Sequence, residues 1–494
     1  MYGDGVNHRA CAATWLVSVK GWLPLCLTFI ALGSLAGCGE LFPAAEPAGC
    51  LALSEPLGSQ AVDVPGRVLT KPDDAIAFIY DQTQLRTFEL RLEDRDLAFL
   101  DADPVAEQYV PGTLVFEGQE YGPVGIRYKG SVGSFLGCTA ESEGLQSSGP
   151  KVCPKLSLKV SFNKFEPEGR FFGVKKLLFH AMVQDDSMMR ERLGYWLFEE
   201  MGVPAPRAVH TRLLINGVYA GVFLNVEYID GRFTRSRFED GEGNLYKEVW
   251  PTRFGQQGPM SAEEILEGLR TNEDESPSVE KMIRFGTELT SASGDMRAEA
   301  VQSWLNVQHT MNYIAVDRTI RADDGPFHFY CIFGECSNHN VYLYEEAKTD
   351  RMYLIPWDLD NAFVIDGDNR TGTDAFLFVE DAWNDATVPC ESGTGFRFFT
   401  LSQMPPSCDP FLNALGCYFT PGYESAVRTF LDGPFSAATV EAQLTAWEEQ
   451  IAAAVDEQFA TNPEHPSPTA WKAATQNLRF RIERLRTQAE ALVP

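Results

Sequence analysis

Apolar and polar residues alternate over short runs in the first half of the chain. Six such runs lie between Ala75 and about Val249: TFELRL, GTLVFEG, VGIRYKG, KLSLKVSF, HTRLLING and AGVFLNVEYI. A period of two places successive side chains on opposite faces, which predicts strands. One segment, DSMMRERLGYWLFEEMGVP, repeats its apolar residues at helical spacing instead. We expect a helix there, capped by Ser187 and ended by Gly202 and Pro204.

The periodicity becomes helical after about Pro251. Four segments predict helices: SAEEILEGLR, AVQSWLNVQHTMNYIAVDRTI, AATVEAQLTAWEEQIAAAVDEQF and TAWKAATQNLRFRIERLRTQAEAL. Two pieces between them, NVYLY and MYLIPWDLD, read as strands. We therefore expect an α+β protein with two lobes. A β-rich first lobe with one main helix would span 71–250, a mainly helical second lobe 251–430, and C-terminal helices 431–494.

The N-terminus has the pattern of an export signal. Arg9 and Lys20 precede an apolar run, GWLPLCLTFIALGS, which is too short to span a bilayer. The run ends in LAGC, which resembles a bacterial lipoprotein signal. We expect residues 1–37 to be removed, Cys38 to carry lipid, and 38–70, rich in Ala, Pro and Gly, to form a flexible tether. The location would be the cell envelope, on the outer membrane or cell surface. The alternative is an ordinary signal peptide with an incidental cysteine.

Charge and cysteine content narrow the class of protein. The formal net charge of −28 argues against a nucleic-acid partner, whose phosphates need a basic surface. Eight of the 11 cysteines remain after Cys38, and an even number in an exported protein favours disulfides. The spacing favours Cys138–Cys153, Cys331–Cys336 and Cys408–Cys417, and leaves Cys50 with Cys390. The histidines show no metal-ligand spacing, so we interpret them as core or surface residues.

Candidate phosphate-binding residues lie in the first lobe. In YKGSVGSF, Lys129 and Gly130 follow a strand, and glycine lets backbone N–H groups approach a phosphate. Lys155 and Lys159 share one face of the next amphipathic strand. A lysine in this position holds nucleotide phosphates in kinases, although solvent exposure is the ordinary role of such a side chain. Glu227 ends the strand GVFLNVEYI, where it would lie near a connection between lobes or be solvated at an edge.

Candidate metal ligands lie in the second lobe. Asp358 and Asp360 in YLIPWDLDNAF would share one face of a strand, where two like charges repel unless a cation lies between them. Asp324 and Asn340 lie upstream, so the chain order is Asp324, Asn340 and Asp358. Phosphoryl transfer needs a carboxylate for the acceptor hydroxyl and ligands for divalent cations, and this series could supply them. The alternative interpretation of Asp323 and Asp324 is a simple Asp-Gly turn.

Seven segments, in order, resemble the CotH kinase family: GIRYKGS, PKLSLKVSFN, SMMRERLGYWLFEEMGVPAPR, LLINGVYAGVFLNVEYID, GNLYKEV, NHNVYLY and IPWDLDNAF. The resemblance covers roughly Lys71 to Gly367. It implies a reduced, atypical protein-kinase-like fold. It also implies ATP with Mg²⁺ or Mn²⁺ as cofactors, and phosphorylation of Ser or Thr on extracytoplasmic proteins.

The resemblance also implies roles for individual residues. Asp358 matches the metal-binding Asp, with Asp360 beside it and Asn340 as a further ligand. Asp324 is preferred over Asp317 as the catalytic Asp, because Arg318 offers Asp317 an ion pair. Lys155 or Lys159 would hold phosphate, and Arg190 or Glu191 would position that lysine. The departure is a long segment between Asp324 and Asn340 that contains Cys331 and Cys336.

Two other functions compete with the kinase. The first is a non-catalytic, kinase-like surface protein for adhesion or coat assembly, with calcium or no ion in the acidic site. The second is a metal-dependent hydrolase built on Asp358 and Asp360, which lacks the usual histidine ligands.

Overall fold

The computed structural model describes residues 75–493, with gaps at 131, 136, 144–145, 254–257, 274–276, 323–324, 328–329, 333–334, 366–400 and 404–407. All described elements fall within one compact unit, Ala44–Pro494. The expected signal, tether and lipidated Cys38 lie outside the described residues, as do Asp324 and the pair Cys50 and Cys390.

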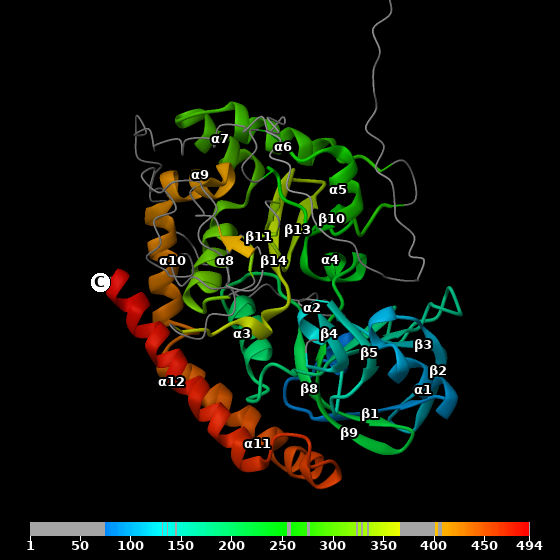
Figure 1. The fold of residues 1–494 in the computed structure, drawn as a ribbon. Helices are drawn as coiled ribbons and strands as arrows, with labels where there is room; N and C mark the ends of the chain where they lie inside the picture. The colour runs from blue at the N-terminus through cyan, green and yellow to red at the C-terminus, as the bar shows by residue number, and fades with distance from the viewer. Residues whose placement is uncertain are drawn as a thin grey trace, which may run out of the picture. The chain divides into compact units, whose positions relative to one another are not determined.

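Seven strands close into a barrel in the order β1-β2-β3-β6-β7-β9-β8 (Figure 1). They are β1 (Arg86–Arg91), β2 (Val110–Phe116), β3 (Gln119–Tyr128), β6 (Leu158–Ser161), β7 (Lys176–His180), β8 (Ala208–Ile215) and β9 (Val218–Val226). β1 pairs with β8 in parallel and the other neighbours pair antiparallel. Phenylalanines fill the interior, and the rings of Phe88 and Phe116 stack with centroids 4.6 Å apart. The barrel thus has its own hydrophobic core.

Short elements flank the barrel. They are η1 (Ala75–Phe78), α1 (Asp94–Ala102), η2 (Pro104–Ala106), α2 (Val132–Phe135), β4 (Thr139–Glu143) and β5 (Gln146–Lys151). The expected disulfide Cys138–Cys153 is confirmed in this region.

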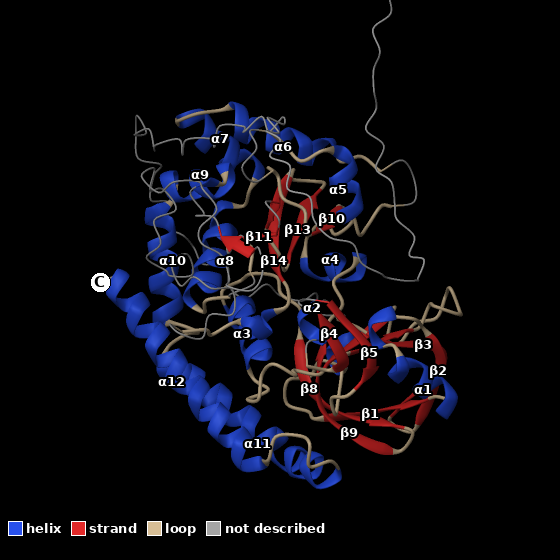
Figure 2. Cartoon of the chain, in the orientation of Figure 1, coloured by secondary structure: helices blue, strands red, loops and turns tan. Residues whose placement is uncertain are grey.

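A second, larger core surrounds the three-stranded sheet β10-β13-β14, which Figure 2 shows among helices. Its strands are β10 (Asn244–Lys247), β13 (Val341–Glu346) and β14 (Arg351–Pro356). The helical elements are α3 (Arg190–Glu200), α4 (Gly231–Arg237), α5 (Ala262–Gly268), α6 (Glu280–Ser291), α7 (Asp295–Trp304), α8 (Val307–Thr319), η3 (Leu359–Asn361), α9 (Pro410–Tyr418), α10 (Thr420–Asp432), α11 (Ala437–Thr461) and α12 (Pro468–Leu492). The fold is therefore α+β, as expected.

Two helix predictions need correction. Helix α3 begins at Arg190, whose N–H donates to the Asp185 carboxylate at 2.8 Å, so Ser187 is not its N-cap. The expected helix AVQSWLNVQHTMNYIAVDRTI is divided between α7 and α8. Asn306 causes the break, because its side chain accepts the His309 N–H at 3.1 Å and caps α8.

Helix α3 was expected in the first lobe, but its apolar residues join the second core. The site described below therefore depends on where α3 meets the barrel. The C-terminal helix α11 also contacts the barrel: the Gln458 side chain accepts the Val222 N–H of β9 at 2.8 Å.

A small sheet in the order β12-β11-β15 contains the cysteine-bearing insertion. Its strands are β11 (Tyr330–Ile332), β12 (Glu335–Ser337) and β15 (Leu401–Gln403). The backbone register places Cys331 opposite Cys336, so the expected hairpin forms, while the side chains of that pair are outside the described part. Cys408 and Cys417 are each disulfide-bonded. Among the described helices, none has the length and apolar character needed to cross a bilayer.

Candidate functional site

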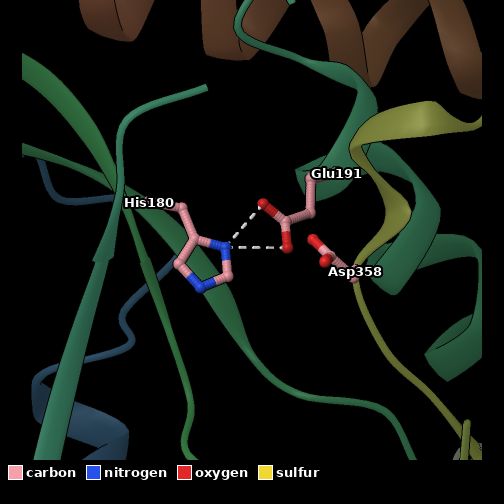
Figure 3. A group of neighbouring side chains, drawn as sticks. All are labelled: His180, Glu191 and Asp358. Carbon is pink, nitrogen blue, oxygen red and sulfur yellow. Dashed lines mark hydrogen bonds and ion pairs between the residues drawn. The ribbon is translucent and has the colours of Figure 1, made fainter. Parts of the chain in front are cut away.

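Four polar side chains from separate elements meet where the barrel faces α3. Lys129 follows β3, His180 ends β7, Glu191 lies in the first turn of α3, and Asp358 follows β14. Figure 3 shows the last three converging. One ligand atom from each of these three lies within 4.8 Å of the others. The group contains oxygen and nitrogen atoms of the kind that bind divalent cations.

Glu191 is the buried centre of this group, with 3% of its surface exposed. Its carboxylate oxygens lie 2.9 and 3.0 Å from His180 Nδ1, and Oε1 also accepts the Tyr195 hydroxyl at 3.1 Å. Burial raises the pKa of the Glu191 carboxyl, but His180, Lys129 and Tyr195 together outweigh burial and lower it. Glu191 is thus held ionised at a fixed position.

Asp358 is placed by a backbone turn rather than by a strand. β14 ends at Pro356, and Asp358 has a left-handed backbone with φ of 55°. Its N–H donates to the Tyr195 hydroxyl at 3.0 Å. The expectation that Asp358 and Asp360 share one strand face is therefore wrong, because Asp360 lies in the helical turn η3. Both carboxylates nevertheless act electrostatically on Lys129.

The two carboxylates of Glu191 and Asp358 oppose each other. Burial raises the pKa of Asp358, the Glu191 charge raises it further, and Lys129 and His180 lower it in part. The net pKa is raised, so the ionised form of Asp358 is destabilised here. A divalent cation at this position would relieve the repulsion, and the described oxygen atoms fit a hard cation.

Asn340 lies at the same end of the sheet as Asp358. Its carbonyl accepts the Trp357 N–H at 3.1 Å, just beyond the pair Val341–Pro356 that ends the β13–β14 ladder. Asn340 is buried and, like Asp358, has a left-handed backbone, with φ of 53°. The strand pair thus brings together the Asn and Asp that the sequence placed 18 residues apart.

Several cations gather around Lys159, and Lys129 is one of them. Lys159 on β6 lies beside Lys176, Arg127 and Lys129. Burial, as the larger cause, and these neighbouring cations together lower the pKa of the half-buried Lys159 to about 7. The Tyr228 ring lies 5.1 Å from Lys159 Nζ and 4.4 Å from Lys176 Nζ. Such a cluster of like charges favours a polyanionic ligand.

Other predicted residues lie apart from the acids. Lys155 is buried rather than solvated, and its ammonium donates to the Val222 carbonyl at 2.6 Å. Of the pair Arg190 and Glu191, only Glu191 enters the group, since Arg190 pairs with Asp185 at 3.7 Å. The Gly130 N–H donates to the Glu107 carboxylate at 3.1 Å.

Glu227 is neither solvated nor at an exposed edge. Its carboxylate binds Arg207 at 2.7 and 2.9 Å and Arg237 at 2.9 Å, and all three side chains are buried. Burial raises the pKa of Glu227, but Arg207 and Arg237 outweigh it and lower the pKa to about 2.

Asp317 lies in the last turn of α8 and is buried. Its Oδ1 would lie 2.7 Å from a β-carbon added at Gly325, so the carboxylate faces the segment that follows Asp324. Asp324 itself lies outside the described residues, so the choice between these two acids stays a prediction.

His180 is a buried residue, as expected for a core histidine, but its side chain also belongs to this group, which the sequence did not indicate. Its ring lies between Lys129 and Glu191, with Nε2 at 2.8 Å from Lys129 Nζ. Sequence motifs for metal sites recognise only histidines that lie close to other ligands along the chain. His180 is distant in sequence from Asp358, and strand pairing in the barrel brings them together. The position of His180 at the end of the apolar strand KLLFH was the available signal.

The chain is similar to known proteins over most of this region. The family described as CotH kinase protein matches residues 126–487, which is well over half of the chain and includes all four side chains. Inner spore coat protein H-like protein of Bacillus subtilis (strain 168) is 38% identical over 73 residues, covering 15% of this chain and 22% of that protein. Inner spore coat protein H of the same strain is 23% identical over 298 residues, covering 57% and 69%. The chain therefore spans less than a quarter of the first relative.

Proposed function

Because the chain belongs to the CotH kinase family, we propose that it transfers the γ-phosphate of ATP to Ser or Thr of extracytoplasmic proteins. The observation that carries this proposal is the convergence of Lys129, Glu191 and Asp358 from three separate elements. Kinases need a lysine for the phosphates, a glutamate that positions it and an aspartate for the metal. The lysine that meets the acids is Lys129, rather than Lys155 or Lys159.

The residues divide the chemistry as follows. Asp358, with Asp360 and Asn340 nearby, would hold Mg²⁺ or Mn²⁺, which would neutralise charge on the transferred phosphate. Lys129 would bind the phosphates directly. Lys159, near Lys129, would add positive charge, as would Lys176 near Lys159. Asp324 or Asp317 would orient the acceptor hydroxyl.

The location is proposed on separate grounds. The sequence pattern ending at Cys38 supports a lipid anchor in the cell envelope, and the names of the two relatives connect them with the spore coat. We propose an extracytoplasmic protein substrate and no nucleic-acid partner, because the chain carries a net charge of −28.

The test is phosphate transfer by the purified protein, with labelled ATP, Mn²⁺ or Mg²⁺, and casein as an acidic acceptor. An Asp358→Asn variant removes one charge from the site. An Asp456→Asn variant makes the same change on the exposed face of α11 and serves as the control. Transfer or autophosphorylation that Asp358→Asn abolishes and Asp456→Asn retains supports the kinase. Absence of both transfer and nucleotide binding in the unaltered protein would leave the non-catalytic surface protein as the better function.

A further inference from the structure

Both ring nitrogens of His180 have a partner. Nδ1 faces the Glu191 carboxylate at 2.9 and 3.0 Å, and Nε2 faces Lys129 Nζ at 2.8 Å. The ring is 5% exposed and packs against the edge of Trp357, with centroids 5.8 Å apart. The imidazole is therefore fixed in both orientation and hydrogen bonding.

The two partners determine which nitrogen carries the proton. An ionised carboxylate only accepts hydrogen bonds, so Nδ1 must carry the hydrogen that Glu191 accepts. An ammonium only donates, so Nε2 must offer its lone pair to Lys129. The imidazole that satisfies both partners is neutral, with its proton on Nδ1.

We propose that His180 is a positioning residue, which links Lys129 to Glu191 through a neutral imidazole in place of a direct lysine–glutamate contact. In protein kinases the lysine pairs with the glutamate itself. Here the ring lies between them, so the position of the ammonium depends on the ring as well as on α3. The consequence for catalysis rests on the proposed function, whereas the hydrogen bonding does not.

The connection continues beyond Glu191. The Tyr195 hydroxyl donates to Glu191 Oε1 and accepts the backbone N–H of Asp358. A continuous chain of hydrogen bonds therefore runs from the phosphate-binding lysine to the backbone of the metal-binding aspartate. Neighbouring hydrogen bonds of this kind restrain one another's geometry.

His180, Glu191 and Asp358 form a group of the kind that can hold a metal ion. The hydrogen bonding of His180 nevertheless argues against a role for its ring as a metal ligand. The protonated Nδ1 donates a hydrogen bond to Glu191 and has no free lone pair for a cation, and the Nε2 lone pair is occupied by Lys129. An ion would therefore bind the oxygens of Asp358 and its neighbours, and its affinity would not depend on His180.

Two substitutions separate these roles. In His180→Gln, the side-chain amide can donate to Glu191 and accept from Lys129, so it keeps a neutral link. In His180→Leu, an apolar side chain replaces the link altogether. His309→Gln is the control for altering a buried histidine, because His309 lies in α8, away from the group, and its Nε2 donates to the Leu354 carbonyl at 2.8 Å.

The first measurement is the imidazole ¹⁵N spectrum of the full protein labelled at its seven histidines, with His180→Gln assigning the resonance. We expect a neutral ring protonated at Nδ1 for His180. A ring protonated at Nε2, or at both nitrogens, would overturn the proposal.

The second measurement is binding and turnover. We expect His180→Leu to raise KM for ATP by about tenfold or more, the usual effect of losing a hydrogen bond to a charged group. His180→Gln should recover most of that loss, and Mn²⁺ affinity, measured with the metal alone, should change by less than about twofold in both variants. Mn²⁺ affinity that falls with both variants would overturn the proposal in favour of a metal ligand. If the unaltered protein transfers no phosphate, the kinase fails while the ¹⁵N and Mn²⁺ results still decide the role of His180.

Discussion

Gly194 of α3 and Leu359 of η3 are in direct contact, and a β-carbon on residue 194 would lie 2.8 Å from Leu359 Cδ1 and 3.2 Å from Leu359 Cβ. This close approach places the turn that contains Asp358 against the helix that contains Glu191. A glycine inside a helix costs about 0.5–1 kcal/mol relative to alanine, so its presence here has a packing reason.

We therefore predict that Gly194→Ala displaces η3 and weakens Mn²⁺ binding about threefold to tenfold, while changing the free energy of unfolding by less than about 2 kcal/mol, because helix propensity offsets part of the crowding. Titration with Mn²⁺ and chemical denaturation measure the two effects. Gly422→Ala in α10 is the control, since its β-carbon would lie at an ordinary 3.5 Å from Met311. If Leu359→Ala does not restore binding to Gly194→Ala, the contact is not the cause.

Removing the charge of Asp358 should have opposite effects with and without metal. Without metal, Asp358→Asn relieves the repulsion by Glu191, so we expect its melting temperature to equal or exceed that of the unaltered protein. With Mn²⁺ at about 100 times Kd, the unaltered protein should gain about 2.7 kcal/mol, and the variant should gain little. Thermal denaturation in EDTA and in Mn²⁺ compares the two. Equal stabilisation of both proteins by Mn²⁺ would exclude Asp358 as a ligand.

Glu227 should contribute stability that depends on pH. Its folded pKa of about 2 lies below the usual value of 4.5, so the folded state binds fewer protons than the unfolded state between these values. Its stabilisation is therefore present above pH 4.5 and is lost as the pH falls towards 2. We predict that Glu227→Gln costs about 3–5 kcal/mol at pH 7, because Arg207 and Arg237 lose a buried partner.

Denaturant unfolding at pH 7 and at low pH measures this effect, and the difference between the two proteins should shrink in acid. Glu117→Gln is the control, since the Glu117 side chain is 59% exposed in its pair with Arg86. That change should cost less than about 1 kcal/mol. A constant difference across the acid range would contradict the buried ion-pair account.

Lys155 should make the free energy of unfolding depend on pH in the alkaline range, in contrast to the acid range of Glu227. Burial lowers its pKa to about 7 from 10.5, so between these values the unfolded state binds more protons than the folded state. Stability then rises with pH across this window, by up to about 1.4 kcal/mol per pH unit for one proton. We predict that Lys155→Met flattens this rise. Unfolding measured from pH 7 to 9 tests it, with Lys472→Met on the exposed face of α12 as the control. An unchanged slope in Lys155→Met would show that the buried amine does not titrate in this range.

Hydrophobic periodicity alone was enough to predict the main strands, the long C-terminal helices and the α+β class. It did not predict short elements such as β7 and β10, whose few residues carry no clear period. The break between α7 and α8 was hidden because the apolar pattern continues through it at Leu305, so only the capping role of Asn306 marks it.

The site was predicted only in part, because its members depend on register. Lys129 donates its N–H to the Ser157 carbonyl at 2.9 Å, and β3 pairs Arg127 with Lys159. This pairing brings Lys129 to the acids and leaves Lys155 at Val222. In the sequence, Lys129, Lys155 and Lys159 were equally plausible as the phosphate-binding lysine, and only strand pairing distinguishes them. Glu191 and Asp358 could be recognised from sequence motifs. The position of His180 beside them became apparent only from the pairing of the strands in the closed barrel.

The smallest fragment that could be studied in isolation must include the last two helices, α11 and α12. Trp471 of α12 donates its indole N–H to the Ser187 carbonyl at 3.0 Å, and Gln450 of α11 accepts from Arg192 at 2.7 Å. Both contacts lie within four residues of Glu191, on either side of it. A recombinant domain cut before Ser436 would keep every candidate site residue in its sequence, yet lose the supports for the start of α3. Domain boundaries for expression should therefore extend through α12, even though no candidate ligand lies beyond Asp360.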